Sequence, residues 1–273
     1  MKISICGKGG SGKSTVVALL ALEARDRGYQ PVVVDTDESN IVLYRMLGFT
    51  QPPVPLVDLA GGKKMVRKLM PPKYAPKEPG LDTNVLSRER LSLADIPTPN
   101  IVEKDGIRLI TIGKILQPLE GCACPMGVLG REFLGKLQLE SGEIAIVDTE
   151  AGIEHFGRGM ETSIDSVLIV VEPSLESVTL AEKVKQMANG IGLDRVWAVL
   201  NKANSGELVS KLTAQLTQRS VAVIASIPYD EEIFNACLDG RPLTKGKTGS
   251  EIKKLFDFII KATQIIEPRM AGT

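Results

Sequence analysis

The sequence lacks three features that would point to particular classes of protein. Its 273 residues carry 33 basic and 33 acidic side chains, so the formal net charge is zero and no strong field favours nucleic acid or a charged membrane. No apolar run approaches the roughly 20 residues that cross a bilayer. The chain begins MKISIC and reaches a glycine-rich loop at once, which leaves no room for a signal peptide. We therefore expect a cytoplasmic protein that binds neither nucleic acid nor membrane.

Cysteine and histidine are also scarce, since the chain has four cysteines and one histidine. In a cytosolic protein, cysteines serve metal binding or redox chemistry more often than structural disulfides. Cys6 falls in an expected strand and Cys237 in an expected helix, and both have the character of small core residues. Cys122 and Cys124, two positions apart in GCACP, remain as candidates for a function.

Short apolar runs alternate with helix-like stretches along most of the chain. The runs are nearly continuous in apolar residues, as expected for strands buried on both faces. Repeated alternation of strand and helix predicts an α/β fold, with a doubly wound, mostly parallel sheet and helices on both faces. The expected strands are Lys2–Cys6, Pro31–Asp35, Ile107–Ile112, Glu143–Asp148, Ser166–Val171, Val196–Leu200 and Val221–Ile227. The expected helices are about 13–27, 128–140, 176–190, 206–218, 230–238 and 249–266.

Residues 51–105 interrupt this alternation. They hold nine of the sixteen prolines and no convincing strand, although Leu56–Met70 has the pattern of a helix. The stretch is too long for an ordinary connection, and such long loops are usually mobile or functional. We therefore expect one domain over residues 1–273, with a proline-rich insertion at about 51–105.

A phosphate-binding motif follows the first expected strand. Gly7, Gly12, Lys13 and Ser14 have the spacing G-x-x-x-x-G-K-S/T, and the loop opens an expected helix, which is the context that the motif requires. Backbone N–H groups of such a loop turn towards phosphate oxygens, and the helix N-terminus adds its positive dipole end. Lys13 is expected to reach the β- and γ-phosphates, and the Ser14 hydroxyl to bind Mg²⁺. The residues expected to contact the nucleotide are Gly9, Gly10, Ser11, Gly12, Lys13, Ser14 and Thr15.

The same loop carries a second lysine, Lys8. The pattern Lys8-Gly9-Gly10-x-Gly12-Lys13-Ser14 resembles the deviant Walker A loop of the MinD, ParA and nitrogenase iron protein class of dimeric ATPases, within the SIMIBI group of P-loop NTPases. In that class the first lysine reaches the nucleotide of the partner subunit. The resemblance implies an ATPase that dimerises with ATP, in which Lys8 offsets charge on the transferring phosphoryl group as an arginine finger does.

Aspartates close two of the expected strands. Asp35 and Asp37 form an i, i+2 pair, which on extended backbone points to one face. The resemblance makes them switch I, where Asp37 would orient or activate the attacking water and Asp35 would lie nearer the loop and Mg²⁺. Such aspartates can also simply cap the next helix. Asp148 ends the run IAIVD, the Walker B arrangement that holds Mg²⁺, and Gly152 is a candidate for the switch II N–H that senses the γ-phosphate.

The pair Cys122 and Cys124 can present two sulfurs to one side, on extended or turn backbone. Two thiolates do not complete a tetrahedral site of four sulfurs. A two-fold dimer repeats the same patch about its axis and can supply the other two. Soft thiolates suit Zn²⁺ or Cu(I), and a square-planar set of four suits Ni²⁺. The pair favours one metal ion between two subunits, and the alternative is two thiols without such a role.

Two longer runs, GCACPMGVLGREFL and DTEAGIEHFGRG, resemble the CooC family, the ATPases that assist nickel insertion into carbon monoxide dehydrogenase. The resemblance extends over nearly the whole chain, and the C-x-C and EAGIEH elements are its specific part. It implies that Cys122 and Cys124 bind one Ni²⁺ or Zn²⁺ ion between subunits. It also implies that ATP binding and hydrolysis drive dimerisation and metal delivery, with nickel carbon monoxide dehydrogenase as the client.

The remaining candidate residues depend on the same resemblance. Asn201 and Pro228 close two expected strands, and in the deviant Walker A class these positions touch adenine. Glu150 and the only histidine, His155, fall in the expected switch II. His155 could add a metal ligand, but a structural or switch role has the better support.

Three other functions stay open from the sequence. A maturation ATPase for acetyl-CoA synthase would differ only in its client. An iron–sulfur carrier ATPase would hold a [4Fe–4S] cluster between its subunits. A spatial regulator of the MinD or ParA type would bind membrane or DNA, which the neutral charge and the cysteine pair oppose.

Overall fold

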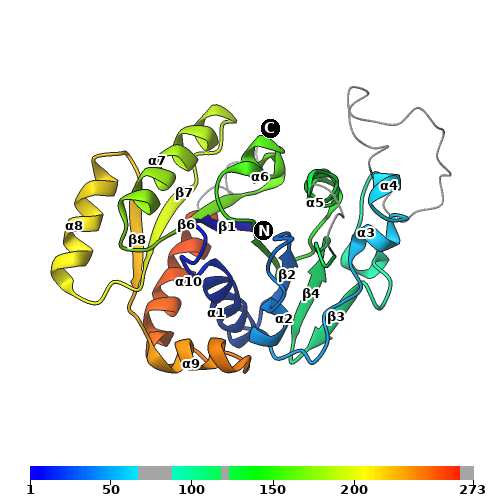
Figure 1. The fold of residues 1–273 in the computed structure, drawn as a ribbon, viewed down its shortest axis with the longest axis horizontal. Helices are drawn as coiled ribbons and strands as arrows, with labels where there is room; N and C mark the ends of the chain where they lie inside the picture. Colours follow the sequence, from blue (N-terminus) through cyan, green and yellow to red (C-terminus); the bar gives the residue numbers. More distant parts are fainter. Residues whose placement is uncertain (67–87, 118–122, 265–273) are drawn as a thin grey trace.

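The computed structural model describes residues 1–66, 88–117 and 123–264. Its strands form one sheet in the order β3-β4-β2-β5-β1-β6-β7-β8 (Figure 1). Among these strands only β3 and β4 run antiparallel to each other. The strands are β1 (Lys2–Gly7), β2 (Gln30–Asp35), β3 (Ile101–Lys104), β4 (Ile107–Thr111), β5 (Glu143–Asp148), β6 (Ser166–Val171), β7 (Val196–Asn201) and β8 (Ala222–Ile227). The prediction of a doubly wound, mostly parallel sheet is confirmed.

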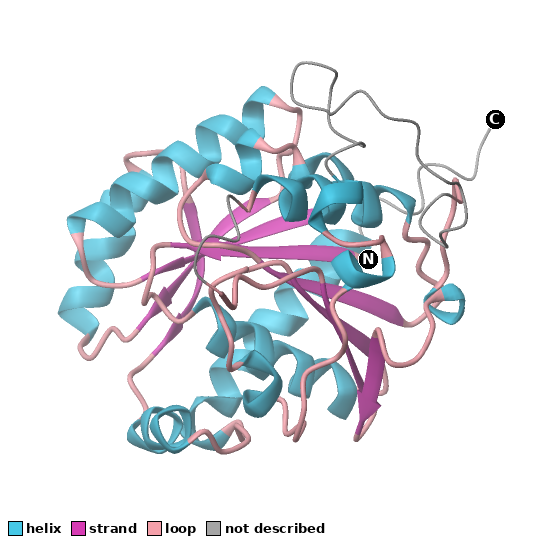
Figure 2. Ribbon diagram, turned by 45° about the vertical axis from the view of Figure 1, so that its right-hand side comes forward, coloured by secondary structure: helices cyan, strands magenta, loops and turns pink. Residues whose placement is uncertain are grey.

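Helices cover both faces of the sheet (Figures 1 and 2). They are α1 (Lys13–Asp26), α2 (Leu43–Met46), α3 (Leu56–Leu59), α4 (Lys63–Val66), α5 (Cys124–Lys136), α6 (Glu154–Gly157), α7 (Leu175–Gly190), α8 (Gly206–Thr217), α9 (Glu231–Asp239) and α10 (Gly249–Gln264). Short 3₁₀ turns occupy Leu93–Asp95, Met160–Ser163 and Gly246–Thr248. No helix among these is long and apolar enough to cross a membrane.

The two faces of the sheet bury separate apolar cores. One core packs beneath α5, α7 and α8, and the other beneath α1, α2 and α10. Along β5, Ala145 and Val147 enter the first core, while Ile144 and Ile146 enter the second. Successive strand residues point to opposite faces, so a strand covered on both sides must be apolar at every position. This explains why the apolar runs in the sequence are continuous.

Strand β3 corrects the expectation that residues 51–105 hold no strand. It pairs with β4 as a hairpin, and the turn is Asp105-Gly106, with φ angles of 49° and 76°. Two successive residues with positive φ make the tight turn that matches the twist of a hairpin, and Asp-Gly is a preferred sequence for it. The Asp-Gly pair was therefore a signal for β3, although the strand itself is only four residues long.

Two predicted helices have different bounds in the structure. The expected helix Leu56–Met70 is broken into α3 and α4 by Gly61 and Gly62, whose φ angles of 82° and 83° are left-handed, and its last four residues lie outside the described part. The helix expected at 128–140 begins at Cys124 and ends at Lys136. Proline suits the first turn of a helix because its φ is already helical and its missing N–H would be unpaired there, so Pro125 belongs inside the helix.

Helix α10 packs one face against the second core, through Ile252, Leu255, Phe256 and Ile259. Phe256 is 1% exposed, and its ring meets Tyr29 edge-on with 5.5 Å between the centroids. Phe258, two residues on, is 38% exposed and packs edge-on against Trp197. The two phenylalanines of one helix therefore differ mainly in burial.

We predict that Phe256→Ala lowers the free energy of unfolding by about 3–5 kcal/mol, because it leaves a cavity in the core. Phe258→Ala should cost less than about 2 kcal/mol, since its ring is partly in water. Chemical denaturation of both variants measures the difference. Equal losses would mean that Phe256 is not more deeply buried than Phe258.

Candidate functional site

The glycine loop between β1 and α1 is held in a conformation that only glycine allows at two positions. Gly7 and Gly12 have φ angles of 144° and 96°. A Cβ on Gly7 would lie 2.5 Å from the Val170 carbonyl oxygen, and one on Gly12 would lie 2.3 Å from Asn201 Nδ2. These contacts are too short for any side chain, so close packing against β6 and β7 explains both glycines of the motif.

Two residues at the end of β7 brace the same loop. The Asn201 side chain donates a hydrogen bond of 2.7 Å to the Ser11 carbonyl oxygen. Lys202 Nζ donates one of 2.6 Å to the Gly10 carbonyl oxygen. The loop is thus fixed from the neighbouring strand end. The adenine contact predicted for Asn201 stays a prediction, and its amide already has this structural role.

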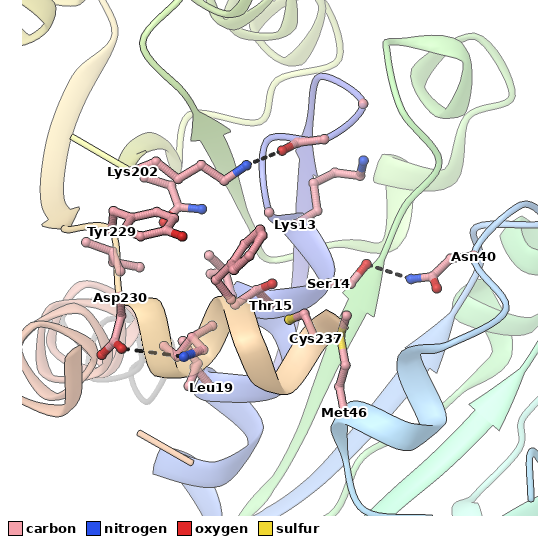
Figure 3. A pocket seen from close by; sticks show the side chains of 18 of the residues that line it. Lys13, Ser14, Thr15, Leu19, Asn40, Met46, Lys202, Tyr229, Asp230 and Cys237 are labelled. Carbon is pink, nitrogen blue, oxygen red and sulfur yellow. Dashed lines mark hydrogen bonds between the residues drawn. The ribbon is translucent and has the colours of Figure 1, made fainter. Parts of the chain in front are cut away.

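Ser14 and Asp148 meet where β5 ends and α1 begins. The Ser14 hydroxyl donates to Asp148 Oδ2 at 2.6 Å. Asn40 Nδ2 donates to the Ser14 oxygen at 2.7 Å, as Figure 3 shows. Asp148 is fully buried, and its Oδ1 has no hydrogen-bond partner within the described part of the chain. Burial raises the pKa of this carboxyl to about 6.

A buried carboxylate oxygen without a partner, beside a hydroxyl, fits the oxygen ligands that Mg²⁺ prefers. Ser14 and Asp148 are therefore the residues that would hold Mg²⁺. A bound Mg²⁺ would neutralise part of the charge on the phosphates of a nucleotide. Asp35 is a weaker candidate, because one of its oxygens pairs with the Lys114 ammonium, whose positive charge would repel a metal cation.

Asp37 caps the turn that follows β2. Its Oδ1 accepts hydrogen bonds from the Ser39 backbone N–H at 2.9 Å and from the Ser39 hydroxyl at 2.6 Å. The Asn40 N–H lies 3.3 Å from the same oxygen. Asp37 thus caps a turn and not the next helix, because α2 begins at Leu43 after Val42, which has no side-chain cap. The predicted role of Asp37 in orienting water stays a prediction, and the residue does line the cavity described below.

Asp35 is paired with a lysine that the sequence analysis did not single out. Lys114 Nζ lies 2.7 Å from Asp35 Oδ2, and both side chains are almost fully buried. Burial raises the pKa of Asp35 to about 7, with Lys114 acting in the opposite direction and Asp148 raising it further. Lys114 follows β4, far from Asp35 in the chain, and no local pattern marks the pair.

Lys8 is engaged within its own chain. Its ammonium lies 3.1 Å from Glu172 and 3.0 Å from Glu176, at the end of β6 and the start of α7. Glu176 is 73% exposed, and ion pairs with such exposed partners contribute little to stability. Lys8 can therefore leave these carboxylates at small cost, and its predicted reach to a partner subunit stays a prediction.

The predicted switch II follows β5. Gly152 has a φ of 96°, and its N–H donates to the Gly7 carbonyl oxygen at 3.2 Å. His155 is fully buried, with Nδ1 against Glu161 and Nε2 at 3.2 Å from the Gly152 carbonyl oxygen. Both ring nitrogens therefore contact protein groups, which supports the structural role. Glu150 pairs with Arg158 at 2.5 Å, and burial together with the neighbouring Glu38 raises the pKa of Glu150 to about 7.

Of the two candidate thiols for a metal, the described residues include one. Cys124 is the first residue of α5 and is partly buried, whereas Cys122 lies outside the described residues. Within residues 1–66, 88–117 and 123–264, no group of three or more His, Cys, Asp or Glu side chains could hold a metal ion. A metal site built from thiolates would therefore need ligands from outside the described residues or from a second chain, as the two-fold arrangement supposes.

A cavity of about 420 Å³ opens beside the loop and extends towards α9. Pro228 and Asn201 line it, and the adenine contact expected of them stays a prediction. Tyr229 and Phe234 line it too, and no pattern in the sequence marks them. Figure 3 shows Met46 and Cys237 close together on one wall, near Ser14. The prediction that Cys237 is a core residue holds in part: its side chain packs against the core beneath α1 and α10, but it is only partly buried and also lines the cavity.

The loop, the serine and aspartate at its base, and the adjoining cavity all lie at the carboxyl ends of parallel strands. This is the place where open α/β sheets bind ligands, and a glycine loop opening a helix there is a phosphate site. The fold and the site thus define a P-loop nucleotide-binding protein.

Comparison with known proteins agrees with this class. Residues 3–243 match the family described as the CobQ/CobB/MinD/ParA nucleotide binding domain, and the chain belongs to this family of P-loop ATPases. It is 41% identical to an uncharacterized ATP-binding protein of Methanocaldococcus jannaschii, over 96% of this chain and all of that one. It is 31% identical to the carbon monoxide dehydrogenase accessory protein CooC of Rhodospirillum rubrum, over 94% of this chain and 97% of that one.

Solved structures show the same fold. MinD of Pyrococcus furiosus aligns with a TM-score of 0.66 and 21% identity, over 96% of this chain and 98% of that one. MinD of Pyrococcus horikoshii, in complex with Mg-ADP, aligns with a TM-score of 0.66 and 20% identity, over 97% of both chains. The resemblance to the deviant Walker A class is thereby confirmed at the level of family and fold.

Cys237 offers a direct probe of the cavity. We predict that MgATP slows its alkylation by about tenfold at a nucleotide concentration ten times the Kd, because the occupied cavity excludes the reagent. Lys13→Ala should lose this protection at the same concentration, since it removes the ammonium expected at the phosphates. Peptide mass spectrometry measures alkylation at Cys237 alone. An unchanged rate in the saturated wild-type protein would place the nucleotide elsewhere.

Proposed function

We propose that this protein is an ATP-dependent metallochaperone that delivers nickel to carbon monoxide dehydrogenase. The observation that carries the proposal is the position of Cys124, which begins α5 next to switch II. A Cβ on Gly127, in the first turn of α5, would lie 2.3 Å from Arg158 Cδ, and Arg158 in turn pairs with Glu150. The thiol-bearing end of α5 is thus packed against a segment that follows the Walker B aspartate.

The similarity to the CooC protein of Rhodospirillum rubrum supports the choice of client. It extends over 94% of this chain and 97% of that protein. The relative with 41% identity is named only as an ATP-binding protein, and it therefore favours no client. Carbon monoxide dehydrogenase is the client that the name of the CooC relative supports.

ATP binding is the step that would assemble the metal site. In the proposed dimer, Lys8 leaves Glu172 and Glu176 and reaches the phosphates bound by the partner. The same association brings Cys122 and Cys124 of both chains together around one Ni²⁺ or Zn²⁺ ion, which is the cargo. Four thiolates from two chains satisfy the ligand count that one chain lacks.

Hydrolysis of ATP to ADP and phosphate would then release the cargo. Asp37 orients the attacking water, and the positive charges of Lys8 and Lys13 stabilise the charge of the transferring phosphoryl group. Loss of the γ-phosphate removes the contact that holds the dimer closed. A metal affinity that differs between the two nucleotide states is what delivery requires.

We predict that the purified, reduced protein binds one Ni²⁺ or Zn²⁺ ion per two chains when a non-hydrolysable ATP analogue is present. Cys122→Ser combined with Cys124→Ser should abolish this stoichiometric binding, because it removes all four thiolates. Elemental analysis after gel filtration gives the ratio, and the variant must still bind MgATP as a control for folding. Retention of the ion by the double variant would move the site elsewhere, and broad absorbance near 400 nm would indicate an iron–sulfur cluster instead.

We predict that Lys8→Ala binds MgATP but no longer dimerises with it, because its ammonium is the group that crosses between subunits. Analytical ultracentrifugation with the ATP analogue distinguishes monomer from dimer. Lys185→Ala serves as the matched control, since Lys185 lies on α7 and donates only to the Asp194 carbonyl among its hydrogen bonds in the described residues. A Lys8→Ala variant that dimerises as the wild type does would remove the trans role of this lysine.

A further inference from the structure

The segment that follows β4 is bonded to switch I along its backbone. The Ile112 N–H donates to the Asp35 carbonyl oxygen at 2.9 Å, which continues the pairing of β4 with β2. The Ile115 N–H donates to the Glu38 carbonyl oxygen at 3.1 Å. Residues 112–115 therefore follow the path of switch I from the strand end to the turn capped by Asp37.

Lys114 adds a side-chain connection at the centre of this segment. Its ammonium contacts the Asp35 carboxylate at 2.7 Å and donates to the Asp37 carbonyl oxygen at 2.5 Å. The side chains of Lys114 and Asp35 are 11% and 5% exposed. Hydrogen bonds that involve buried charges are stronger than neutral ones, and they are costly to leave incomplete. One lysine thus holds both aspartates of switch I in a single arrangement.

The neighbouring residue connects the same segment to α5. A Cβ on Gly113 would lie 2.4 Å from Met126 Sδ and 2.8 Å from Met126 Cγ. Met126 is 2% exposed and stands in the first turn of α5, two residues after Cys124. The backbone at Gly113 therefore rests directly on this methionine. In a close-packed interior, such contacts transmit a displacement because there is no space to absorb it.

We propose that Lys114 is a positioning residue that transmits the state of switch I to the Cys124 end of α5. When a nucleotide and its Mg²⁺ change the arrangement of Asp35 and Asp37, Lys114 moves with them, and Gly113 displaces Met126. The significance for metal delivery rests on the proposed function, whereas the coupling itself needs no transition metal. Lys114 contacts neither nucleotide nor metal in this scheme, so it acts only through its neighbours.

The rate of alkylation of Cys124 tests this coupling. Reduced protein free of transition metals is compared with MgADP and with the Mg²⁺ complex of a non-hydrolysable ATP analogue, and Cys124 is followed by peptide mass spectrometry. We expect the rates in the two states to differ by roughly fivefold or more in the wild type, in the range usual for allosteric coupling. In Lys114→Met the difference should fall below about twofold, and Lys114→Arg should restore part of it because it returns the charge.

Nucleotide affinity separates this role from general damage to the site. Lys114→Met should bind both nucleotides within about threefold of the wild-type Kd, since a positioning residue touches neither of them. Met126→Ala tests the other end of the connection without changing switch I, and it should also reduce the difference in Cys124 alkylation. Lys185→Met is the control that should leave the difference intact.

Two outcomes would overturn the proposal. One is a wild-type protein in which Cys124 reacts equally in both nucleotide states. The other is a full response in Lys114→Met, or in Met126→Ala if Lys114→Met does not fold. Neither result bears on whether four thiolates bind a metal, because the elemental analysis of the dimer answers that question separately. If the protein binds no metal but Cys124 still responds to the nucleotide, the coupling through Lys114 stands and the proposed metal delivery falls.

Discussion

The site depends on the cost of burying two carboxylates side by side, in register on adjacent strands. Asp35 and Asp148 are directly paired in the ladder between β2 and β5, and both are almost completely buried. Burial raises the pKa of Asp35 to about 7 and that of Asp148 to about 6. Repulsion from a neighbouring carboxylate acts in the same direction, from Asp148 on Asp35 and from Asp37 on Asp148. Two such groups are stable side by side only with positive charge or hydrogen-bond donors close by. The surrounding segments are arranged to supply them.

The neighbouring elements contribute such groups. The start of α1 brings the Ser14 hydroxyl to Asp148 and places Lys13 where it lowers the pKa of that carboxyl. The segment after β4 brings Lys114 to Asp35. Among the described residues, one oxygen of each aspartate is still without a partner. A nucleotide with Mg²⁺ would supply a cation to these oxygens. Its binding can therefore move every element that contacts Asp35 or Asp148.

The order of the strands brings the segment after β4 and switch II to the same helix, α5. Because β4 lies beside β2, the residues directly after β4 follow switch I. The first turn of α5 consequently contacts both switches: Met126 packs against Gly113, and Gly127 packs against Arg158 of switch II. The proposed transfer of information from phosphate to thiol needs no long pathway, since at each of these two glycines the backbone rests directly on a side chain of the other segment.

The α/β fold, the phosphate loop and the strand-end aspartates could be predicted from the sequence, because these depend on local periodicity and on short fixed spacings. The Asp105-Gly106 turn of β3 was also visible there, although the proline-rich surroundings obscured it. The pairing of Lys114 with Asp35 and the place of Cys237 in a cavity wall follow from tertiary packing alone. Those contacts join residues distant in the chain, and they arise from the order of the strands and the packing of helices upon them, for which no local pattern exists.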